Sequence, residues 1–415
     1  MKDARLVAFE TLYDVLKDGA YSNIAIDNSL SEVNQKDKPF ISSIVYGVIE
    51  RKLTLDYILD KFLTSKPKLK IRIVLYIGAY QLYFMDKVPS SAAINTSVNL
   101  AGKVGLEYYK KLINAVLRKV DAERIDIDSI DDLSVKYSCP PHLINMWRKM
   151  YGKESANSIL EAINGKPPVF AVPNTLYIDA DELQYELLNC GIDCSVVGDV
   201  VKISSSFDLS NCKTFIDGLF HIEDLSSYNC AVALDAKSEE TVFDICSAPG
   251  GKAFTIAERM KNKGRIYAFD LHEHRVKLIN DGAKRLGINI IDAEVNDALI
   301  FNSEFPKADR ILCDVPCSGF GIIRRKPEIR YKELDSIKEL PEIQYNILNT
   351  SAKYLKDGGR LIYSTCTLNK RENEKVVERF LSENSCYSLK YSKTEFPSSD
   401  GGDGFYYAVM EKKND

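Results

Sequence analysis

The chain has few of the residues and spacings that metal centres and disulfide frameworks need. Its 415 residues include four histidines, and the ten cysteines stand singly, with no Cys-x-x-Cys pair. Two Cys-x-x-x-Cys spacings, at 190/194 and 313/317, have no second pair of ligands nearby. A disulfide framework and a zinc site are therefore not expected, and we predict no metal cofactor.

Long apolar runs and a leader-type start are also missing. The longest apolar stretch, residues 71–85, contains Arg72 and Gln81 and is too short to span a bilayer. Residues 1–5 lead into no apolar signal core. We expect a soluble, cytoplasmic protein that has no membrane partner and acts as a monomer.

The composition excludes the non-globular classes of protein. The chain is 45% hydrophobic and 27% charged, and it contains no fixed-period repeat or low-complexity tract. This balance is typical of folded proteins rather than of disordered chains, collagens or coiled coils. At roughly 100–200 residues per domain, the length predicts two to four domains.

Charge is distributed unevenly along the chain. Residues 1–120 hold 18 basic and 12 acidic residues, a net charge of +6, whereas the remainder carries −10. A basic first domain on an acidic chain is a modest indication of nucleic-acid binding. The alternative is a solvated helix face without a partner, which composition alone favours.

Periodicity divides the chain into three parts. Apolar residues recur at helical spacing through residues 1–125, which predicts an all-α domain. Residues 126–235 begin with an acidic stretch and continue with short helical and strand-like runs, which predicts a linker and a small α+β module. Residues 236–415 alternate strand and helix patterns, which predicts a Rossmann-like α/β domain with a mostly parallel sheet. The main predicted helices are 39–62, 71–86, 90–103, 106–120, 140–163, 181–189, 273–286, 338–356 and 371–382, and the strands of the last domain are 241–246, 265–270, 291–295, 310–315, 360–366 and 405–412.

The carboxyl ends of these strands are where chemistry is expected, because ligands of open α/β sheets bind there. The first strand leads through Asp244 into the loop 246–252, whose two glycines let a ligand approach the backbone closely. The second strand ends in Asp270, 26 residues after Asp244, a spacing that suits a carboxylate on a ribose diol. Asp297 follows the third strand.

The loop narrows the choice of cofactor. It lacks the G-x-G-x-x-G pattern of NAD-binding proteins and the first glycine of a phosphate-binding P-loop. Ala253 stands where a P-loop carries the hydroxyl that holds magnesium. A nucleoside cofactor without a pyrophosphate remains, and S-adenosylmethionine is the candidate. The alternative is that these glycines and acids only shape turns, but functional side chains at four strand ends of one sheet favour a ligand site.

Two cysteines lie at strand ends and carry a second prediction. Cys317 follows the fourth strand just after Asp314, and Cys366 follows a later strand. For Cys246 and Cys313 a small buried hydrophobic residue is the simpler interpretation. A thiolate has a specific use in alkylating cytosine, because its addition at C6 lets the otherwise unreactive C5 attack a methyl group. An acid must then hold the N3/N4 edge of the base, and a base must remove the C5 proton.

Together these motifs resemble the NOL1/NOP2/Sun family of RNA cytosine-5 methyltransferases. The matching stretches are DICSAPGGK (244–252), Asp270, Asn296-Asp297, DVPCSG (314–319), GIIRRKPEI (321–329), YSTCT (363–367) with RENE (371–374), and DGFYYAVM (403–410). Two strand-end cysteines, one after Asp-x-Pro and one after Ser-Thr, separate this family from DNA cytosine-5 methyltransferases, which keep a single Pro-Cys nucleophile.

The first domain resembles the NusB-type RNA-binding module of the Sun (RsmB-type) 16S rRNA methyltransferases. The similar stretches are residues 44–59, 76–98 and 112–119. The resemblance implies that RNA is the partner and that the enzyme is of the type that methylates C5 of cytosine 967 in 16S rRNA. Two alternatives stay open: the same chemistry on tRNA or 23S rRNA, and a non-catalytic RNA-binding factor for assembly or antitermination.

The resemblance also implies a role for each site residue. Cys366 would be the nucleophile, Asp314 would hold the N3/N4 edge, and Cys317 would assist product release. Lys252 would order the site around Asp314, Asp270 would bind the ribose, and Asp297 would contact the adenine side. The cofactor-binding set would comprise Cys246, Ser247, Ala248, Pro249, Gly250, Gly251, Lys252, Asp270, Asp297 and Asp314, and RNA phosphate would be bound by Arg324 and Arg325.

Overall fold

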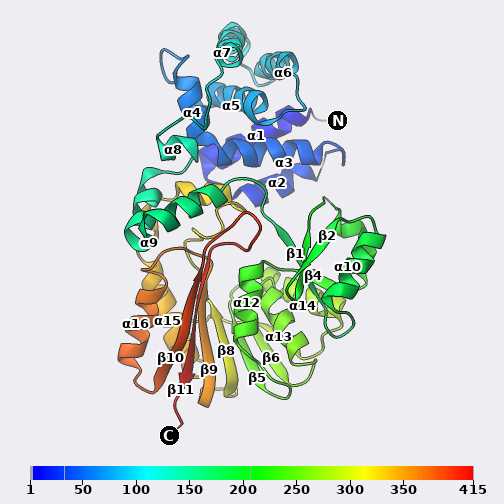
Figure 1. Cartoon of the computed structure of the whole chain (residues 1–415), viewed down its shortest axis with the longest axis vertical. Helices are drawn as coiled ribbons and strands as arrows, with labels where there is room; N and C mark the ends of the chain where they lie inside the picture. The colour runs from blue at the N-terminus through cyan, green and yellow to red at the C-terminus, as the bar shows by residue number, and fades with distance from the viewer. Residues whose placement is uncertain (1–2, 32, 206, 415) are drawn as a thin grey trace. The chain divides into compact units, whose positions relative to one another are not determined.

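A computed structural model of the chain describes residues 3–31, 33–205 and 207–414 (Figure 1). The chain divides into two compact units. The first contains the residues up to Lys149 together with Ile163–Gly165 and Ile323–Lys332, and the second contains Met150–Ala162, Lys166–Ile322 and the residues from Glu333 onward. Within the described residues, each helix is too short or too polar to cross a membrane.

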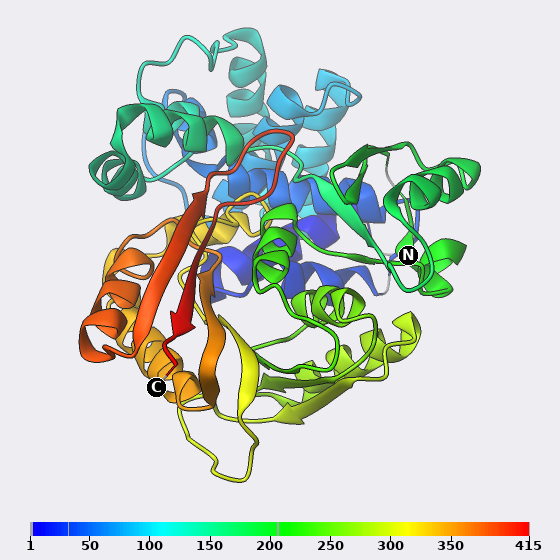
Figure 2. The same ribbon diagram turned by 60° about the horizontal axis from the view of Figure 1, so that its bottom comes forward.

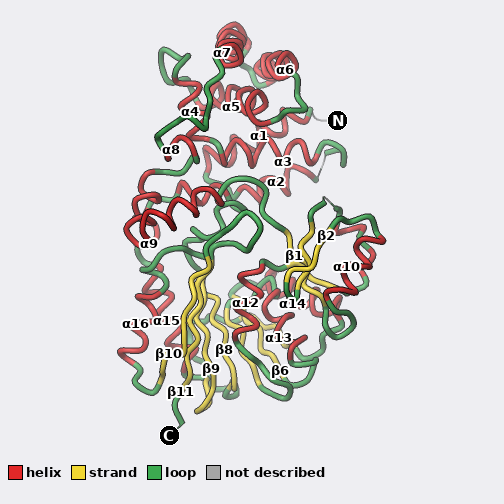
Figure 3. The backbone as a smooth tube through the Cα atoms, viewed as in Figure 1, coloured by secondary structure: helices red, strands yellow, loops and turns green. Residues whose placement is uncertain are grey.

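The first unit is helical, and its described residues form no strand (Figure 3). Its central helix, α5, packs against five other helices and buries most of its residues. A helix in that position needs apolar residues on almost all sides, and α5 has them. The helices are α1 (Ala4–Asp18), α2 (Ser22–Leu30), α3 (Lys38–Glu50), α4 (Lys52–Asp60), α5 (Leu69–Phe84), α6 (Ser90–Lys103), the 3-10 turn η1 (Glu107–Tyr109), α7 (Lys110–Ala122) and α8 (Leu133–Lys136). The all-α prediction for this part is confirmed.

Two details of the helical unit differ from the predictions. The run predicted as one helix over 39–62 is two helices, because the chain leaves the helical conformation at Arg51 (φ −100°, ψ 15°) between α3 and α4. Helix α2 was not predicted; it is short, and its side chains at Ser22, Asn28 and Ser29 interrupt the apolar pattern.

A segment from the far end of the chain is part of the helical unit. The 3-10 turn η3 (Pro327–Tyr331) carries Arg330, which is fully buried. The Arg330 guanidinium donates hydrogen bonds to the backbone carbonyls of Glu50, Ser138 and Ile163 at 2.9–3.1 Å, and to the side chain of Asn164 at 3.0 Å. The segment after Ile322 is therefore fixed inside the helical unit by a buried cation.

Helix α9 (Pro141–Ala162) falls in the predicted middle part, 126–235, and its backbone is non-helical at Gly152, where φ is 84°. A small module follows, with helix α10 packed on a four-stranded antiparallel sheet of order β2-β3-β1-β4. Its elements are β1 (Val169–Pro173), α10 (Ala180–Asn189), β2 (Cys194–Val197), β3 (Val200–Ile203), η2 (Leu209–Asn211), α11 (Lys213–Ile216) and β4 (Phe220–Ile222).

The remaining residues build a seven-stranded sheet of order β10-β11-β9-β8-β5-β6-β7, which Figure 2 shows from orange-red β10 through red β11 and orange β9 to yellow β8. Strands β5 to β9 are parallel, β11 runs antiparallel to its neighbour β9, and the edge strand β10 runs antiparallel to β11 and so in the same direction as β5 to β9. The elements are α12 (Leu225–Ala233), β5 (Thr241–Ile245), α13 (Gly251–Arg259), β6 (Arg265–Asp270), α14 (Glu273–Leu286), β7 (Ile291–Val295), β8 (Ala308–Asp314), η4 (Leu334–Ile337), α15 (Leu340–Ala352), β9 (Leu355–Thr365), α16 (Glu374–Glu383), β10 (Tyr387–Glu395) and β11 (Phe405–Lys412). The predicted α/β class is confirmed.

Helices cover both faces of this sheet. Along β5, Phe243 packs into a core shared with α15 and α16, whereas Val242 packs into a second core shared with α12, α13 and α14. This alternation is the two-residue period of a strand buried on both sides. Edge strand β10 was not predicted, because its middle residues are exposed and polar. The predicted helix 338–356 ends earlier, at Ala352, where β9 is about to begin.

Candidate active site

The two strand-end cysteines meet at one edge of the sheet. Strands β8 and β9 are parallel neighbours whose register places Asp314 beside Ser364, so both strands end at the same level. Cys366 directly follows β9 and Cys317 lies three residues beyond β8. Their sulfur atoms are 3.3 Å apart, within hydrogen-bond distance. The parallel pairing of β8 and β9 therefore brings together two thiols that are 49 residues apart in the sequence.

The two thiols are not equivalent. The hydrogen bond to Cys366, burial, and the negative charges of Glu372 and Asp314 all hold the pKa of Cys317 well above its ordinary value. Cys317 therefore stays a neutral thiol, and its S–H is the natural donor to the Cys366 sulfur. Such a bond stabilises negative charge on Cys366, which is the charge that a nucleophilic cysteine carries.

A half-buried ion pair, Lys252 with Asp314, lies beside the loops that carry the two cysteines. The Lys252 ammonium donates to the Asp314 carboxylate at 2.6 Å, and the Ser364 hydroxyl donates to its other oxygen at 2.9 Å. Burial alone would lower the pKa of Lys252, but Asp314 and Glu223 raise it above its ordinary value, so the amine stays charged. The side chain of Asp314 keeps 24% of its surface exposed, which leaves the carboxylate accessible.

The loop 246–252 after β5 contains left-handed backbone conformations, one of them at a glycine. Cys246 and Gly250 adopt left-handed conformations, with φ of 61° and 109°. A Cβ on Gly250 would lie 2.5 Å from the ring of Phe254, so the position accepts only glycine. Helix α13 begins at Gly251, directly after the turn.

Asp244, at the end of β5, is buried beneath this loop. The Ser247 hydroxyl donates to one of its oxygens at 2.6 Å, and the other oxygen has no hydrogen-bond partner among the described residues. Burial raises the pKa of Asp244 to about 7, against the opposing effects of Ser247 and Lys252. A buried oxygen without a hydrogen-bond partner among the described residues thus lies directly beneath the loop.

Asp270 and Asp297 lie at the next two strand ends. Asp270 is buried at the end of β6, and its carboxylate pairs with Arg275 at 3.0 Å. Arg275 also donates to the carbonyl of Ala248 at 2.8 Å, so it bridges the loop and Asp270. Asp297 is half-buried, and the neighbouring Asn296 donates its backbone N–H to the Asp270 carbonyl at 3.0 Å. The structure thus places Asp270, which is predicted to bind the ribose, next to the segment that carries Asp297, which is predicted to contact the adenine.

The remaining predicted pair, Arg324 and Arg325, belongs to the helical unit. Arg324 is buried and Arg325 is half-buried, so Arg325 is the one with surface to offer to a phosphate. Their role in RNA binding stays a prediction, as do the roles of the other site residues.

Sequence reasoning missed several side chains that hold the site. Arg275 lies five residues after the strand-end Asp270, on the first turn of α14, and it pairs with that acid at 3.0 Å. Ser364 directly precedes the Thr365-Cys366 pair and its contact with Asp314 follows from the β8–β9 register. Glu372 belongs to the matched stretch RENE (371–374) but received no role; it is fully buried against the Cys317 loop, a contact across 54 residues.

A buried charged cluster links the small module to helix α13. His221 lies 3.5 Å from both Glu223 and Glu258, and the Thr255 hydroxyl donates to Glu223 at 2.8 Å. Burial alone would lower the pKa of His221, but Glu258 and Glu223 raise it to about 9. A Cβ on Gly251 would lie 3.3 Å from the Glu223 carboxyl, so this cluster reaches the start of α13.

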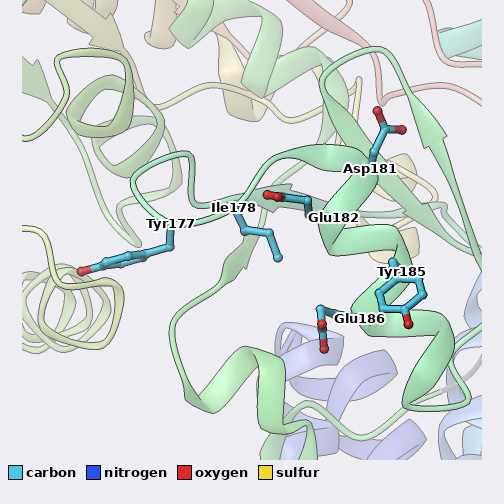
Figure 4. A pocket seen from close by; sticks show the side chains of 6 residues that line it. All are labelled: Tyr177, Ile178, Asp181, Glu182, Tyr185 and Glu186. Atoms are coloured by element: carbon cyan, nitrogen blue, oxygen red, sulfur yellow. The ribbon is translucent and has the colours of Figure 1, made fainter.

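A shallow hollow on the small module lies apart from these residues (Figure 4). Its rim includes three carboxylates and two tyrosines, and the lining residues are Tyr177, Ile178, Asp181, Glu182, Tyr185 and Glu186. Three acids repel a phosphate backbone, so this hollow does not suit RNA. Among the described residues, no cluster of histidine, cysteine and acidic side chains has the arrangement of a metal site.

Known proteins resemble both parts of the chain. The family model described as 16S rRNA methyltransferase RsmB/F matches residues 231–411, and the NusB family model matches residues 2–122. The chain is 36% identical to the probable ribosomal RNA small subunit methyltransferase B of Bacillus subtilis, over 99% of this chain and 98% of that protein. The Synechocystis protein with the same name is 34% identical over 92% and 89% of the two chains. Among solved structures, the crystal structure of PH0851 has a TM-score of 0.82 at 26% identity and covers 99% of both chains.

Proposed function

The chain belongs to the RsmB/F family of 16S rRNA methyltransferases, and we propose that it methylates C5 of a cytosine in 16S rRNA, of the cytosine 967 type, through a covalent adduct of Cys366 with C6. Membership of this family makes it an S-adenosylmethionine-dependent RNA methyltransferase. The observation that carries the proposal is the 3.3 Å approach of Cys317 and Cys366 at the same sheet edge as the Lys252–Asp314 pair.

The residues at the strand ends fit S-adenosylmethionine. The left-handed turn at Gly250 leaves the backbone of the loop 246–252 open to close approach, and beneath it Asp244 has a buried oxygen without a partner among the described residues. Lys252 is paired with Asp314 and is therefore not directed at a phosphate, which suits a nucleoside cofactor without one. The loop, Asp270 and Asp297 would hold the cofactor. When bound, it supplies the methyl group that C5 of cytosine attacks.

The chain's own residues would prepare the base. The Cys366 thiolate forms a bond to C6, and the electron pair of the C5–C6 double bond moves toward C5. Asp314 accepts a hydrogen bond from the N4 amino group, and Lys252 keeps the carboxylate in place. Cys317 donates its S–H to Cys366 before the attack and so stabilises the thiolate.

Product release would use the second cysteine. Once the Cys366 sulfur is bonded to carbon, Cys317 loses the hydrogen bond that is the largest cause of its raised pKa, which makes release of its proton to water less costly. The Cys317 thiolate then takes the C5 proton. The freed electron pair restores the C5–C6 double bond, and the C6–S bond breaks to return Cys366 as a thiolate. The target base must leave its stack to reach these groups, so an unpaired cytosine is expected.

Methyl transfer from tritiated S-adenosylmethionine to protein-free small-subunit rRNA tests the proposal, with tRNA and large-subunit rRNA as parallel substrates. The expected result is label at one cytosine of small-subunit rRNA with the wild-type chain and none with Cys366→Ser. Label on tRNA or 23S rRNA instead would keep the chemistry and reject the substrate. Cofactor binding without transfer to any RNA would reject the enzyme and favour a non-catalytic assembly factor.

A further inference from the structure

One buried carboxylate, that of Glu372, connects the two loops that carry Cys317 and Cys366 through hydrogen bonds. Glu372 has no exposed surface, and its two oxygens accept four hydrogen bonds. The Ser318 backbone N–H (2.8 Å) and Gln344 (3.0 Å) donate to Oε2, and the Ser318 hydroxyl (2.6 Å) and Asn369 (2.7 Å) donate to Oε1. The four donors fill the acceptor sites of one ionised carboxylate.

All four donors are neutral, which is an unusual environment for a buried charge. A buried carboxylate usually has a cationic partner, because desolvation of an unpaired charge is costly. A glutamine at this position has the same shape, but its NH₂ group would meet two donors instead of offering an acceptor. The geometry therefore requires a carboxylate.

The donors belong to the segments that carry the two thiols. Ser318 is next to Cys317 in the chain, and Gln344 donates to the carbonyl of Pro316 on the other side of that cysteine at 3.0 Å. Glu372 thus fixes the backbone immediately after Cys317, and its partner Gln344 fixes the backbone immediately before it.

The Cys366 segment is held by the same network. The Thr367 and Ser318 hydroxyls lie 2.7 Å apart, and the Gly321 N–H donates to the Cys366 carbonyl at 3.0 Å. A Cβ on Gly321 would lie 2.8 Å from that carbonyl, so the two loops are in close contact. The distance between the thiols is therefore set by contacts that converge on Glu372.

We propose that Glu372 is a positioning residue for methyl transfer, which holds the Cys317 thiol beside Cys366 so that one sulfur attacks and the other takes the C5 proton. This inference rests on the proposed function of the two cysteines. The hydrogen bond to Cys366 and burial are the main causes of the raised pKa of Cys317, and the negative charges of Glu372 and Asp314 add to them. Burial likewise raises the pKa of the nearby Tyr363, and Cys317 adds to that shift.

The substitution Glu372→Gln tests the proposal, because it keeps the shape and removes the charge. The expected result is a kcat at least 10-fold lower with an unchanged KM for RNA. The displaced Cys317 slows proton removal more than attack, so a protein–RNA adduct stable to denaturant accumulates with this variant. Glu240→Gln is the matched control. Glu240 pairs with Arg310 at 3.0 Å near the amino ends of β5 and β8, at the other end of these strands from the cysteines. This control is expected to lower the thermal midpoint without adduct accumulation.

Two outcomes would overturn the proposal. One is a Glu372→Gln variant with wild-type kcat, and the other is a loss of activity that follows the folded fraction and leaves no adduct. A second experiment separates a failure of the positioning role from a failure of the proposed function. Iodoacetamide alkylates the thiols in the absence of RNA, and mass spectrometry measures the rate at each cysteine. We expect Cys366 to react faster than Cys317 in the wild type, and the ratio of their rates to shrink at least threefold in Glu372→Gln. An unchanged ratio contradicts the positioning role, whatever the RNA substrate.

Discussion

Asp314 and Ser364 are register partners at the ends of strands β8 and β9, and the Ser364 hydroxyl donates to the Asp314 carboxylate at 2.9 Å. This one pairing fixes the level at which both strands end. Because Cys317 and Cys366 follow those ends, the backbone alone brings the two thiols to the same edge as the Lys252–Asp314 ion pair.

Removal of the Lys252 ammonium is expected to harm catalysis more than cofactor binding. Lys252→Met leaves the Asp314 carboxylate with the Ser364 bond alone, so the base edge would be held by a poorly oriented acceptor. We expect kcat to fall by about 100-fold or more, with a much smaller change in cofactor affinity measured by calorimetry. Lys356→Met, which removes an exposed pair with Asp309, is the control and should keep the wild-type rate. A Lys252→Met variant with normal kcat would contradict the role of the ion pair.

The turn at Gly250 is expected to reject any side chain. Gly250→Ala combines a φ of 109° with a Cβ placed 2.5 Å from Phe254, at a cost of about 1–2 kcal/mol for the backbone and about 1–3 kcal/mol for the clash. Chemical denaturation and cofactor titration measure both effects. Gly191→Ala is the control, because its φ is 74° but nothing lies within 4 Å. It should show the backbone cost alone, and equal losses for both variants would contradict the account.

The cluster around His221 predicts a stability that falls as the pH rises. Burial would lower the pKa of His221, but Glu258 and Glu223 raise it from 6.5 to about 9. The folded state then holds this proton more tightly than the unfolded state, so the contribution is complete below pH 6.5 and is lost toward pH 9. We expect the stability difference between the wild type and His221→Gln to shrink by about 1–3 kcal/mol across this range. A difference that stays constant or grows with pH would show that His221 is neutral in the fold.

The buried guanidinium of Arg330 is expected to stabilise the helical unit. Arg330→Met leaves the carbonyls of Glu50, Ser138 and Ile163 without this donor inside the protein, and the expected cost is about 3 kcal/mol. Thermal and urea unfolding measure it. The exposed pair of Arg265 with Asp292 offers a comparison, and Arg265→Met should leave the unfolding midpoint unchanged. Equal midpoints for the two variants would contradict a structural role for Arg330.

The strand ends could be predicted from the sequence, because each apolar strand pattern is followed by polar residues. Ligands of open α/β sheets bind at the carboxyl ends of the strands, which shows where such residues matter. Asp244, Asp270, Asp314 and Cys366 all lie where that rule places them. The edge strand β10 escaped prediction because its exposed residues carry no buried alternation. The break between α3 and α4 escaped because apolar periodicity continues across Arg51.

Contacts between distant segments were beyond any local pattern. Glu372 lies in the stretch RENE (371–374) that the family resemblance includes, but only the fold shows its partner Ser318, 54 residues away. Arg330 likewise reads as a surface cation in a basic stretch, yet it is fully buried 280 residues from its partner Glu50. A buried charge cannot be told from an exposed one until its partners are placed.

In the proposed mechanism Cys366 attacks the base and Cys317 completes the release. The most direct test incubates Cys317→Ser, Cys366→Ser and the double variant with S-adenosylmethionine and small-subunit rRNA, followed by separation under denaturing conditions. The account predicts a covalent protein–RNA complex with Cys317→Ser alone, and none with Cys366→Ser or the double variant. A complex that forms with Cys366→Ser and is lost in Cys317→Ser would reverse the two roles and contradict the account.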